Sequence, residues 1–175
     1  HVKKTGGTTL QQVLARNYHA GALVALNAPV LYAHPDALFR LSDPVEPARQ
    51  ARFFVVMGHH KYGDVLYSLL QPRLVHFTLL RDPVARVVSH FRAVWGKPTH
   101  PLHELARHRG LAGFVEANPA LECQDAQTHR LAGTQERLRL TAVDGRRALE
   151  AAQRHLIETT SLFGVSEEFD AFLLM

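Results

Sequence analysis

Four short apolar runs that alternate with helical patterns constrain the fold of this chain more than any other feature. Each run is bounded by polar or turn-forming residues, as expected for a buried strand. The runs cover residues 22–26, 53–57, 74–80 and 162–165. Apolar residues three or four positions apart predict three helices, marked by Leu10, Val13, Leu14 and Tyr18, by Val84, Val87, Val88, Phe91 and Trp95, and by Leu149, Ala152 and Leu156. Strands alternating with helices predict an α/β fold with a mainly parallel central sheet covered by helices on both faces.

The length of the chain suits a single domain. A chain of 175 residues builds one ordinary globular core rather than two. Hydrophobic residues make up 46% of it, which disfavours a disordered chain, and Cys123 is its single cysteine, so no intrachain disulfide is possible. Residues 96–140 carry short helical patterns broken by proline and glycine, and they predict a helical insertion. We expect residues 1–175 to form one domain, truncated at both ends.

The charge balance favours an anionic ligand. Lysine and arginine number 20 against 16 aspartates and glutamates, a formal net charge of +4. Net charge alone does not distinguish nucleic acid, a nucleotide, an acidic sugar or a lipid surface. No apolar run approaches the roughly 18 residues of a membrane span, so we expect no transmembrane segment in this chain.

A glycine-containing loop near the start of the chain is the first candidate for an anion site. Residues 3–9 read Lys-Lys-Thr-Gly-Gly-Thr-Thr and directly precede the first helical pattern. Backbone N–H groups of such a turn, with the positive end of a helix, cradle anions, and Lys4 adds a charge. The alternative interpretation is a basic turn in which Thr8 or Thr9 caps the helix. Residue types alone favour neither.

The order of residues in this loop separates two kinds of phosphate site. A nucleotide kinase loop has its lysine after the second glycine, whereas here lysine precedes the glycines. Residues 1–9 resemble the 5′-phosphosulfate loop of sulfotransferases that use 3′-phosphoadenosine 5′-phosphosulfate (PAPS), most closely the heparan sulfate and related carbohydrate sulfotransferases. The departure is Lys3, where many relatives have proline or glutamine. The resemblance implies that the sulfonate is contacted by Lys4 and that the 5′-phosphate is held by Thr5, Gly6, Gly7, Thr8 and Thr9.

A second element follows the apolar run 74–80. Local chemistry explains Asp82 as a helix N-cap and Pro83 as the first helical residue. Taken alone, Arg81 suits a surface pair with Asp82, and Ser89 an exposed position about 140° from the apolar stripe of its helix. Within the pattern R-D-P-V-x-R-V-V-S-H, however, the two resemble the 3′-phosphate element of the same sulfotransferases. The resemblance implies that Arg81 and Ser89 hold the 3′-phosphate.

Histidine is the candidate base. Residues 58–63 read Gly-His-His-Lys-Tyr-Gly and resemble the G-H-x-x-Y-G segment of carbohydrate sulfotransferases, whose histidine takes the proton of the acceptor. This implies His59 as the base, with His60 second, and histidine titrates in the range that suits this task. The alternative is a hydrogen-bonded structural histidine, because twelve histidines make chance pairs common.

Other patterns carry weaker predictions. Gln127 and Arg130 lie in a segment that resembles Q-T-R-x-L-x-G with its arginine shifted by one place, so a role in acceptor binding is only weakly indicated. Ser166 is expected to cap a late helix, and Cys123 to be buried or inert. Three histidines more readily suit a solvated helix face than a metal site, because no cysteine or carboxylate completes a ligand set. They are His100, His103 and His108.

Together these patterns predict a P-loop NTPase-like three-layer α/β fold and a PAPS-dependent sulfotransferase. The resemblance implies transfer of sulfonate to a hydroxyl acceptor, expected to be a glycan rather than nucleic acid, without a metal. It places a bacterial enzyme in the cytoplasm and a eukaryotic one in the Golgi lumen. The alternatives are a nucleotide-dependent kinase on the same scaffold, disfavoured by the residue order of the loop, and a non-catalytic module that binds polyanions.

Overall fold

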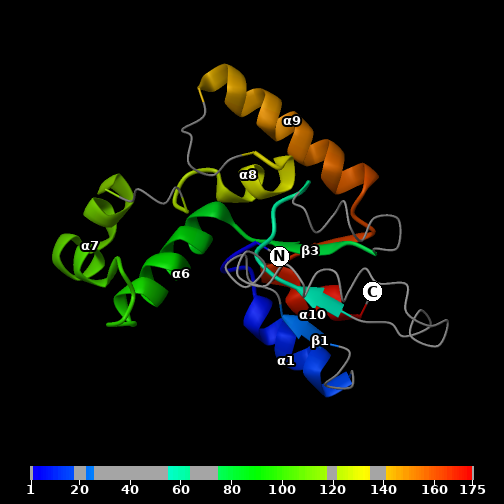
Figure 1. Cartoon of the computed structure of the whole chain (residues 1–175), viewed down its shortest axis with the longest axis horizontal. Helices are drawn as coiled ribbons and strands as arrows, with labels where there is room; N and C mark the ends of the chain where they lie inside the picture. Colours follow the sequence, from blue (N-terminus) through cyan, green and yellow to red (C-terminus); the bar gives the residue numbers. More distant parts are fainter. Residues whose placement is uncertain are drawn as a thin grey trace, which may run out of the picture.

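The structure, a computed structural model, describes residues 2–17, 23–25, 55–63, 75–117, 122–134 and 141–174 (Figure 1). Its elements, in chain order, are α1 (Gly7–Asn17), β1 (Leu23–Ala25), β2 (Val55–Met57), β3 (Phe77–Leu80), α6 (Pro83–Trp95), α7 (His103–Ala117), α8 (Ala126–Ala132), α9 (Ala142–Glu158), β4 (Leu162–Val165), the 3₁₀-helix η2 (Ser166–Glu168) and α10 (Phe169–Leu173). Each predicted run contains a strand, and the three helical patterns fall in α1, α6 and α9. Tyr18 and residues 22, 26, 53, 54 and 74 lie outside the described residues.

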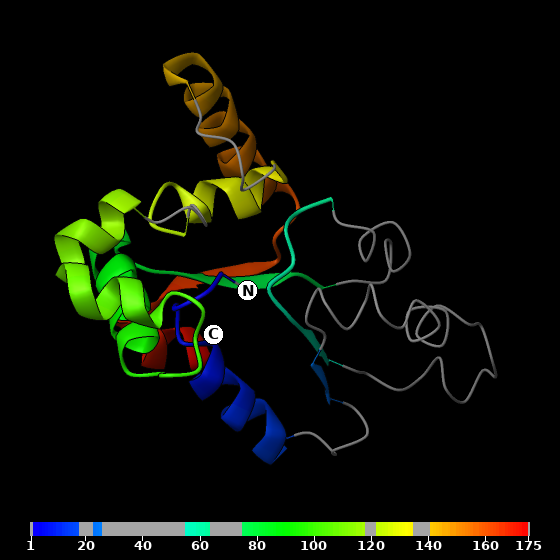
Figure 2. The ribbon, with the colours of Figure 1, turned by 60° about the vertical axis from the view of Figure 1, so that its left-hand side comes forward.

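The strands pair in parallel, as the alternation of elements predicts. β1 pairs with β2 from Leu23 opposite Val55 onward, and β3 pairs with β4 from Phe77 opposite Leu162 onward. Among the described residues these form two separate two-stranded sheets. Both views place α8 and α9 on one side of the β3–β4 pair and α1 and α10 on the other (Figures 1 and 2). The fold is therefore mixed helix and parallel strand, while a three-layer arrangement around one central sheet stays a prediction.

Two apolar clusters hold the described elements together. One is formed by Leu10, Met57, Leu79 and Phe172, which join α1, β2, β3 and α10. The other joins α6 to α7 through Val94, Ala106 and Phe114. Leu10 lies in the first part of α1 and Leu79 near the end of β3, so this cluster packs the start of α1 against the end of β3. These are the two places where the sequence predicts phosphate contacts.

The buried face of the helix α6 is not its apolar stripe. Its buried residues are Arg86, His90 and Val94, whereas Val84 is 70% exposed and Trp95 57% exposed. Of the apolar stripe that marks this helix in the sequence, Phe91 packs against the second cluster, whereas Val84, Val87 and Val88 line an open pocket. Hydrophobic spacing identifies only apolar contacts, and here the inward face carries an arginine whose charge is balanced by a buried carboxylate.

Three capping predictions have different outcomes. Asp82 caps α6, since its carboxylate accepts a hydrogen bond of 2.7 Å from the N–H of Ala85, and Pro83 is the first helical residue as predicted. The alternative that Thr8 or Thr9 caps α1 is wrong, because the helix already begins at Gly7. Ser166 is not an N-cap either. Its hydroxyl donates to the Leu80 carbonyl at 2.9 Å and so ties the end of β4 to the end of β3.

The predicted helical insertion contains α7 and α8 within residues 96–140. In α7 the backbone of Gly110 has φ 61°, which separates two helical pieces. In the part of the chain that the structure describes, none of the helices combines the length and the apolar character that crossing a bilayer requires.

Candidate anion-binding site

The loop before α1 has a defined and unusual backbone. Lys4 and Gly6 have φ values of 68° and 89°, both in the left-handed region. At Gly6 an added Cβ would lie 3.2 Å from the ring of Phe169, so glycine is needed there for its conformation and for space. Thr5 is buried and its hydroxyl donates to the Val2 carbonyl at 2.8 Å. The loop therefore holds a fixed shape directly before α1, whose first N–H groups have no acceptor within the helix.

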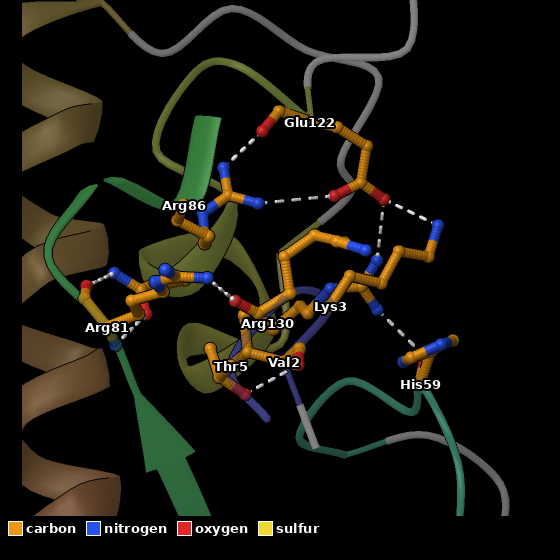
Figure 3. Close-up of polar contacts among 10 residues, drawn as sticks. Val2, Lys3, Thr5, His59, Arg81, Arg86, Glu122 and Arg130 are labelled. Carbon is orange, nitrogen blue, oxygen red and sulfur yellow. Dashed lines mark hydrogen bonds and ion pairs between the residues drawn. The ribbon is translucent and has the colours of Figure 1, made fainter. Parts of the chain in front are cut away.

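Arg81 joins the second predicted phosphate element to this loop. Its Nη1 donates to the carbonyl of Lys4 at 3.1 Å (Figure 3). Its Nε lies 3.8 Å from a carboxylate oxygen of Glu167. The ion pair between Arg81 and Asp82 considered above is not formed, since the Asp82 carboxylate caps α6. The two elements that the sequence predicts for the two ends of one nucleotide are thus in direct contact.

The main chain of Arg81 is held by one side chain. The amide oxygen of Gln127 accepts from the Arg81 N–H at 3.0 Å, and its NH₂ group donates to the Arg81 carbonyl at 2.8 Å. Gln127 lies on α8, so this helix sets the position of residue 81 at the end of β3. Ser89, two turns into α6, is half-buried and makes no side-chain hydrogen bond to Arg81 or Lys4 among the described residues.

A buried carboxylate that the sequence analysis did not single out lies at the centre of the site. An oxygen of Glu122 is 2.6 Å from Lys3 Nζ and 3.0 Å from Arg130 Nη2, and the other is 3.6 Å from Arg86 Nη1. The Glu122 carbonyl also accepts from Arg86 Nη2. The side chains of Glu122, Arg86 and Arg130 are 6%, 3% and 5% exposed.

The charge state of Glu122 follows from these partners. Burial on its own would raise the pKa of the Glu122 carboxyl, but the hydrogen bond from Lys3 and the charges of Arg130 and Lys3 outweigh it, so the pKa lies below its usual range. Lys3 and Glu122 are 119 positions apart, and neither lies in a periodic pattern. Sequence spacing therefore gave no signal for this cluster. Arg86 stands inside the 81–89 motif, but nothing in the sequence indicates that its partner is Glu122.

The segment carrying the candidate base is tied to the same cluster. Arg130 donates from Nη1 to the carbonyl of His59 at 2.8 Å, while its own carbonyl accepts from the N–H of Tyr62 at 2.7 Å. Two residues of the Q-T-H-R segment, Gln127 and Arg130, therefore contact the predicted site loops. The weakly indicated acceptor role for these two residues stays a prediction.

Burial and positive charge keep the His59 imidazole neutral. They lower its pKa from 6.5 to about 4, chiefly through burial, with added contributions from nearby cations that include Lys3 and Arg130. The imidazole is thus in the form that accepts a proton, but a pKa of about 4 makes it a weaker base than the histidine titrating near neutral pH that the sequence leads us to expect. His60 is half-buried and lines a small cavity together with Tyr62, whose ring stacks on His155 with 3.6 Å between centroids.

An open pocket of about 550 Å³ is lined by residues of α6, α7, α8 and the segment before α8. It is bounded by Pro83, Val84, Val87, Val88, Leu111, Val115, Cys123, Gln124, Asp125 and His129. Much of the apolar stripe of α6 thus faces this pocket and not the core. Lys4, Arg81 and Ser89 are not among the residues that line it. Cys123 is half-buried at the pocket wall.

The histidines considered for a metal have other contacts. His103 is within hydrogen-bond distance of the Val94 carbonyl at 3.3 Å, and the exposed His108 pairs with Glu104 at 3.0 Å. Within the described ranges no group of three or more histidine, cysteine or acidic side chains is arranged to hold a metal ion.

No protein family, curated protein or solved structure matches this chain. Its own residues and their contacts are therefore the basis for assigning a function.

Proposed function

We propose that this chain is a PAPS-dependent sulfotransferase on a P-loop-like scaffold, which transfers sulfonate to a hydroxyl group of a carbohydrate. The observation that carries the proposal is the hydrogen bond of 3.1 Å between the Arg81 guanidinium and the Lys4 carbonyl. It brings together two elements that resemble the 5′- and 3′-phosphate elements of one family. A nucleotide phosphorylated at both positions needs two anion sites that are close and fixed relative to each other.

The residues present fit such a nucleotide. The left-handed conformations of Lys4 and Gly6 shape a turn that leads directly into α1, the arrangement by which backbone N–H groups and a helix start bind phosphate. Lys4 and the segment from Thr5 to Thr9 would hold the 5′-phosphosulfate end. Arg81 and Ser89 would hold the 3′-phosphate, with the guanidinium supplying the charge-assisted bond.

His59 and Lys4 would divide the chemistry. When bound, the nucleotide supplies the sulfonate, whose bond to the 5′-phosphate oxygen breaks as a bond to the acceptor oxygen forms. The neutral imidazole of His59 takes the proton of the acceptor hydroxyl. The ammonium of Lys4 would stabilise the oxygen on which negative charge develops, where a nearby positive charge is most effective.

Isothermal titration calorimetry with adenosine 3′,5′-bisphosphate, the desulfated product, tests this assignment. We expect tight binding without a divalent metal, and about a 10- to 100-fold loss of affinity in Lys4→Ala and in Arg81→Ala, because each removes a charge-assisted contact. The matched controls are Lys97→Ala and Arg92→Ala, which remove cations from exposed positions. A preference for magnesium-ATP would favour the kinase. Nucleotide binding unchanged in both variants, with polyanion binding reduced, would favour the binding module.

A further inference from the structure

We propose that Glu122 is the positioning residue of this site, and that its carboxylate sets the phosphate loop and the segment of the base relative to each other. The geometric part of this inference stands on the contacts that Glu122 makes with Lys3, Arg130 and Arg86. Its consequence for catalysis rests on the proposed function.

On the loop side, two consecutive residues are anchored. Lys3 Nζ lies 2.6 Å from Oε1 of Glu122, and the carbonyl of the next residue, Lys4, accepts from Arg81. The loop enters α1 three residues later at Gly7. Moving Lys3 would therefore shift the main chain at Lys4, the residue proposed to face the reacting sulfonate.

On the base side, a single guanidinium forms the bridge. Arg130 contacts Oε1 of Glu122 through Nη2 at 3.0 Å and the His59 carbonyl through Nη1 at 2.8 Å. Figure 3 shows Arg130 between the two, with Lys3 on the same carboxylate oxygen. The distance between the phosphate loop and His59 is thus set through two bonds to one oxygen.

The third partner extends the arrangement to α6. Arg86 contacts both the carboxylate and the main-chain carbonyl of Glu122. It lies on α6, and in the sequence it stands between Arg81 and Ser89. Three cations from three different parts of the chain therefore share one buried carboxylate. Without that negative charge, two buried arginines and Lys3 repel one another at close range, so the arrangement depends on the charge and not only on the volume of the side chain.

The single thiol of the chain makes the geometric part measurable without any nucleotide. Cys123 follows Glu122 directly and lines the open pocket, so its rate of reaction with an aromatic disulfide reagent reports how firmly this segment is held. We expect Glu122→Gln to react at least about tenfold faster than the wild type, since the segment loses its charged anchors. Glu104→Gln, at an exposed position on α7, is the matched control and should react at the wild-type rate.

Binding of adenosine 3′,5′-bisphosphate tests the consequence for the site. We expect at least about tenfold weaker binding in Glu122→Gln, which keeps the shape and loses the charge, and partial recovery in Glu122→Asp, which keeps the charge and is one methylene shorter. A side chain that only fills space would give the reverse order. In a double-mutant cycle, Lys3→Gln should weaken binding in the wild type and add little in Glu122→Gln, because both changes break the same contact.

Two results would contradict the proposed role of Glu122. Wild-type thiol reactivity in Glu122→Gln, or additive effects of the two substitutions, would overturn the proposal. If Glu122→Gln does not fold, Lys3→Gln replaces it, since the Lys3 side chain is 38% exposed, and an unchanged thiol rate in that variant would count against the role of Glu122. If the wild-type protein does not bind the nucleotide, the proposed function fails, while the thiol rates still decide whether Glu122 organises these loops.

Discussion

At the scale of single residues, the roles of the side chain and the main chain of His59 can be tested separately. The contact that ties it to Arg130 uses its carbonyl, not its ring. Removing the imidazole therefore leaves that bond in place. We expect His59→Ala to lose turnover by about 10²- to 10⁴-fold, the range of general-base catalysis, while the affinity for adenosine 3′,5′-bisphosphate stays near that of the wild type.

Single-turnover sulfate transfer together with calorimetry measures both quantities for His59→Ala. His108→Ala, which changes an exposed histidine on α7, is the control for removing an imidazole from this histidine-rich chain. Turnover that persists in His59→Ala and disappears in His60→Ala would move the base to the second histidine of the pair.

Gly6 carries a prediction about the loop itself. Alanine at this position must adopt φ 89° and must place its Cβ 3.2 Å from the Phe169 ring. Gly110→Ala is a matched control, because Gly110 also has a positive φ of 61° but has open space around it. We expect Gly6→Ala to lower the free energy of unfolding by about 1–3 kcal/mol, and by more than Gly110→Ala does. Urea unfolding of both variants checks the difference, and equal losses would argue against the contact with Phe169.

At the scale of elements, α6 shows where sequence patterns succeed and where they fail. The bounds of the helix followed from local chemistry, since Asp82 and Pro83 mark its start in the sequence as they do in the structure. The buried face of the helix did not follow from local chemistry. The pairing of Arg86 with Glu122 depends on a contact between residues far apart in the chain, and a pattern that scores apolar spacing has no means of weighing it.

The orientation of α6 gives a prediction that separates the two faces. Val94 is 1% exposed within the α6–α7 cluster, so Val94→Ala should lower the free energy of unfolding by about 2 kcal/mol, from lost burial and the cavity that remains. Val84 is 70% exposed, and Val84→Ala should change the free energy of unfolding by less than about 0.5 kcal/mol. Chemical denaturation measures both. A larger loss at Val84 would restore the orientation that the sequence pattern predicts.

The positions of the loops around the site could be predicted from sequence, because these loops follow the ends of strands. The predicted strands end where the described strands end, at Met57 and Leu80, and loops beyond parallel strands gather on one side of a sheet. The contacts among these loops come from α8 and from Glu122. Gln127 and Arg130 were visible as a motif, but their targets, the main chains of Arg81 and His59, are a property of the folded chain.

At the scale of the whole molecule, the buried His90 and the half-buried His59 make stability depend on pH. Burial is the chief cause that lowers the pKa of His59 and of His90 from 6.5 to about 4. For His90, the nearby Arg86 lowers the pKa further and Glu122 opposes this. Between pH 4 and 6.5 the unfolded chain therefore binds more protons at these sites than the folded chain. The free energy of unfolding should rise with pH across this window and level off above it.

Urea midpoints measured at pH 5 and pH 7 check this dependence. We expect a higher midpoint at pH 7, and a smaller difference in His90→Gln, which removes one of the histidines whose pKa is lowered. His108→Gln, at an exposed position, should leave the difference unchanged. A midpoint that is equal at the two pH values would show that neither imidazole is held neutral by the fold.

The clamp that Gln127 forms on Arg81 has a consequence for the chemistry of that position. Both hydrogen bonds reach the main chain, so the amide acts as a surrogate for the peptide group of a neighbouring strand. Any residue with a free N–H can be seated there in the same way. The main-chain position of residue 81 is thus fixed independently of its side chain. A different side chain at this position would change which ligand binds there without altering the sheet.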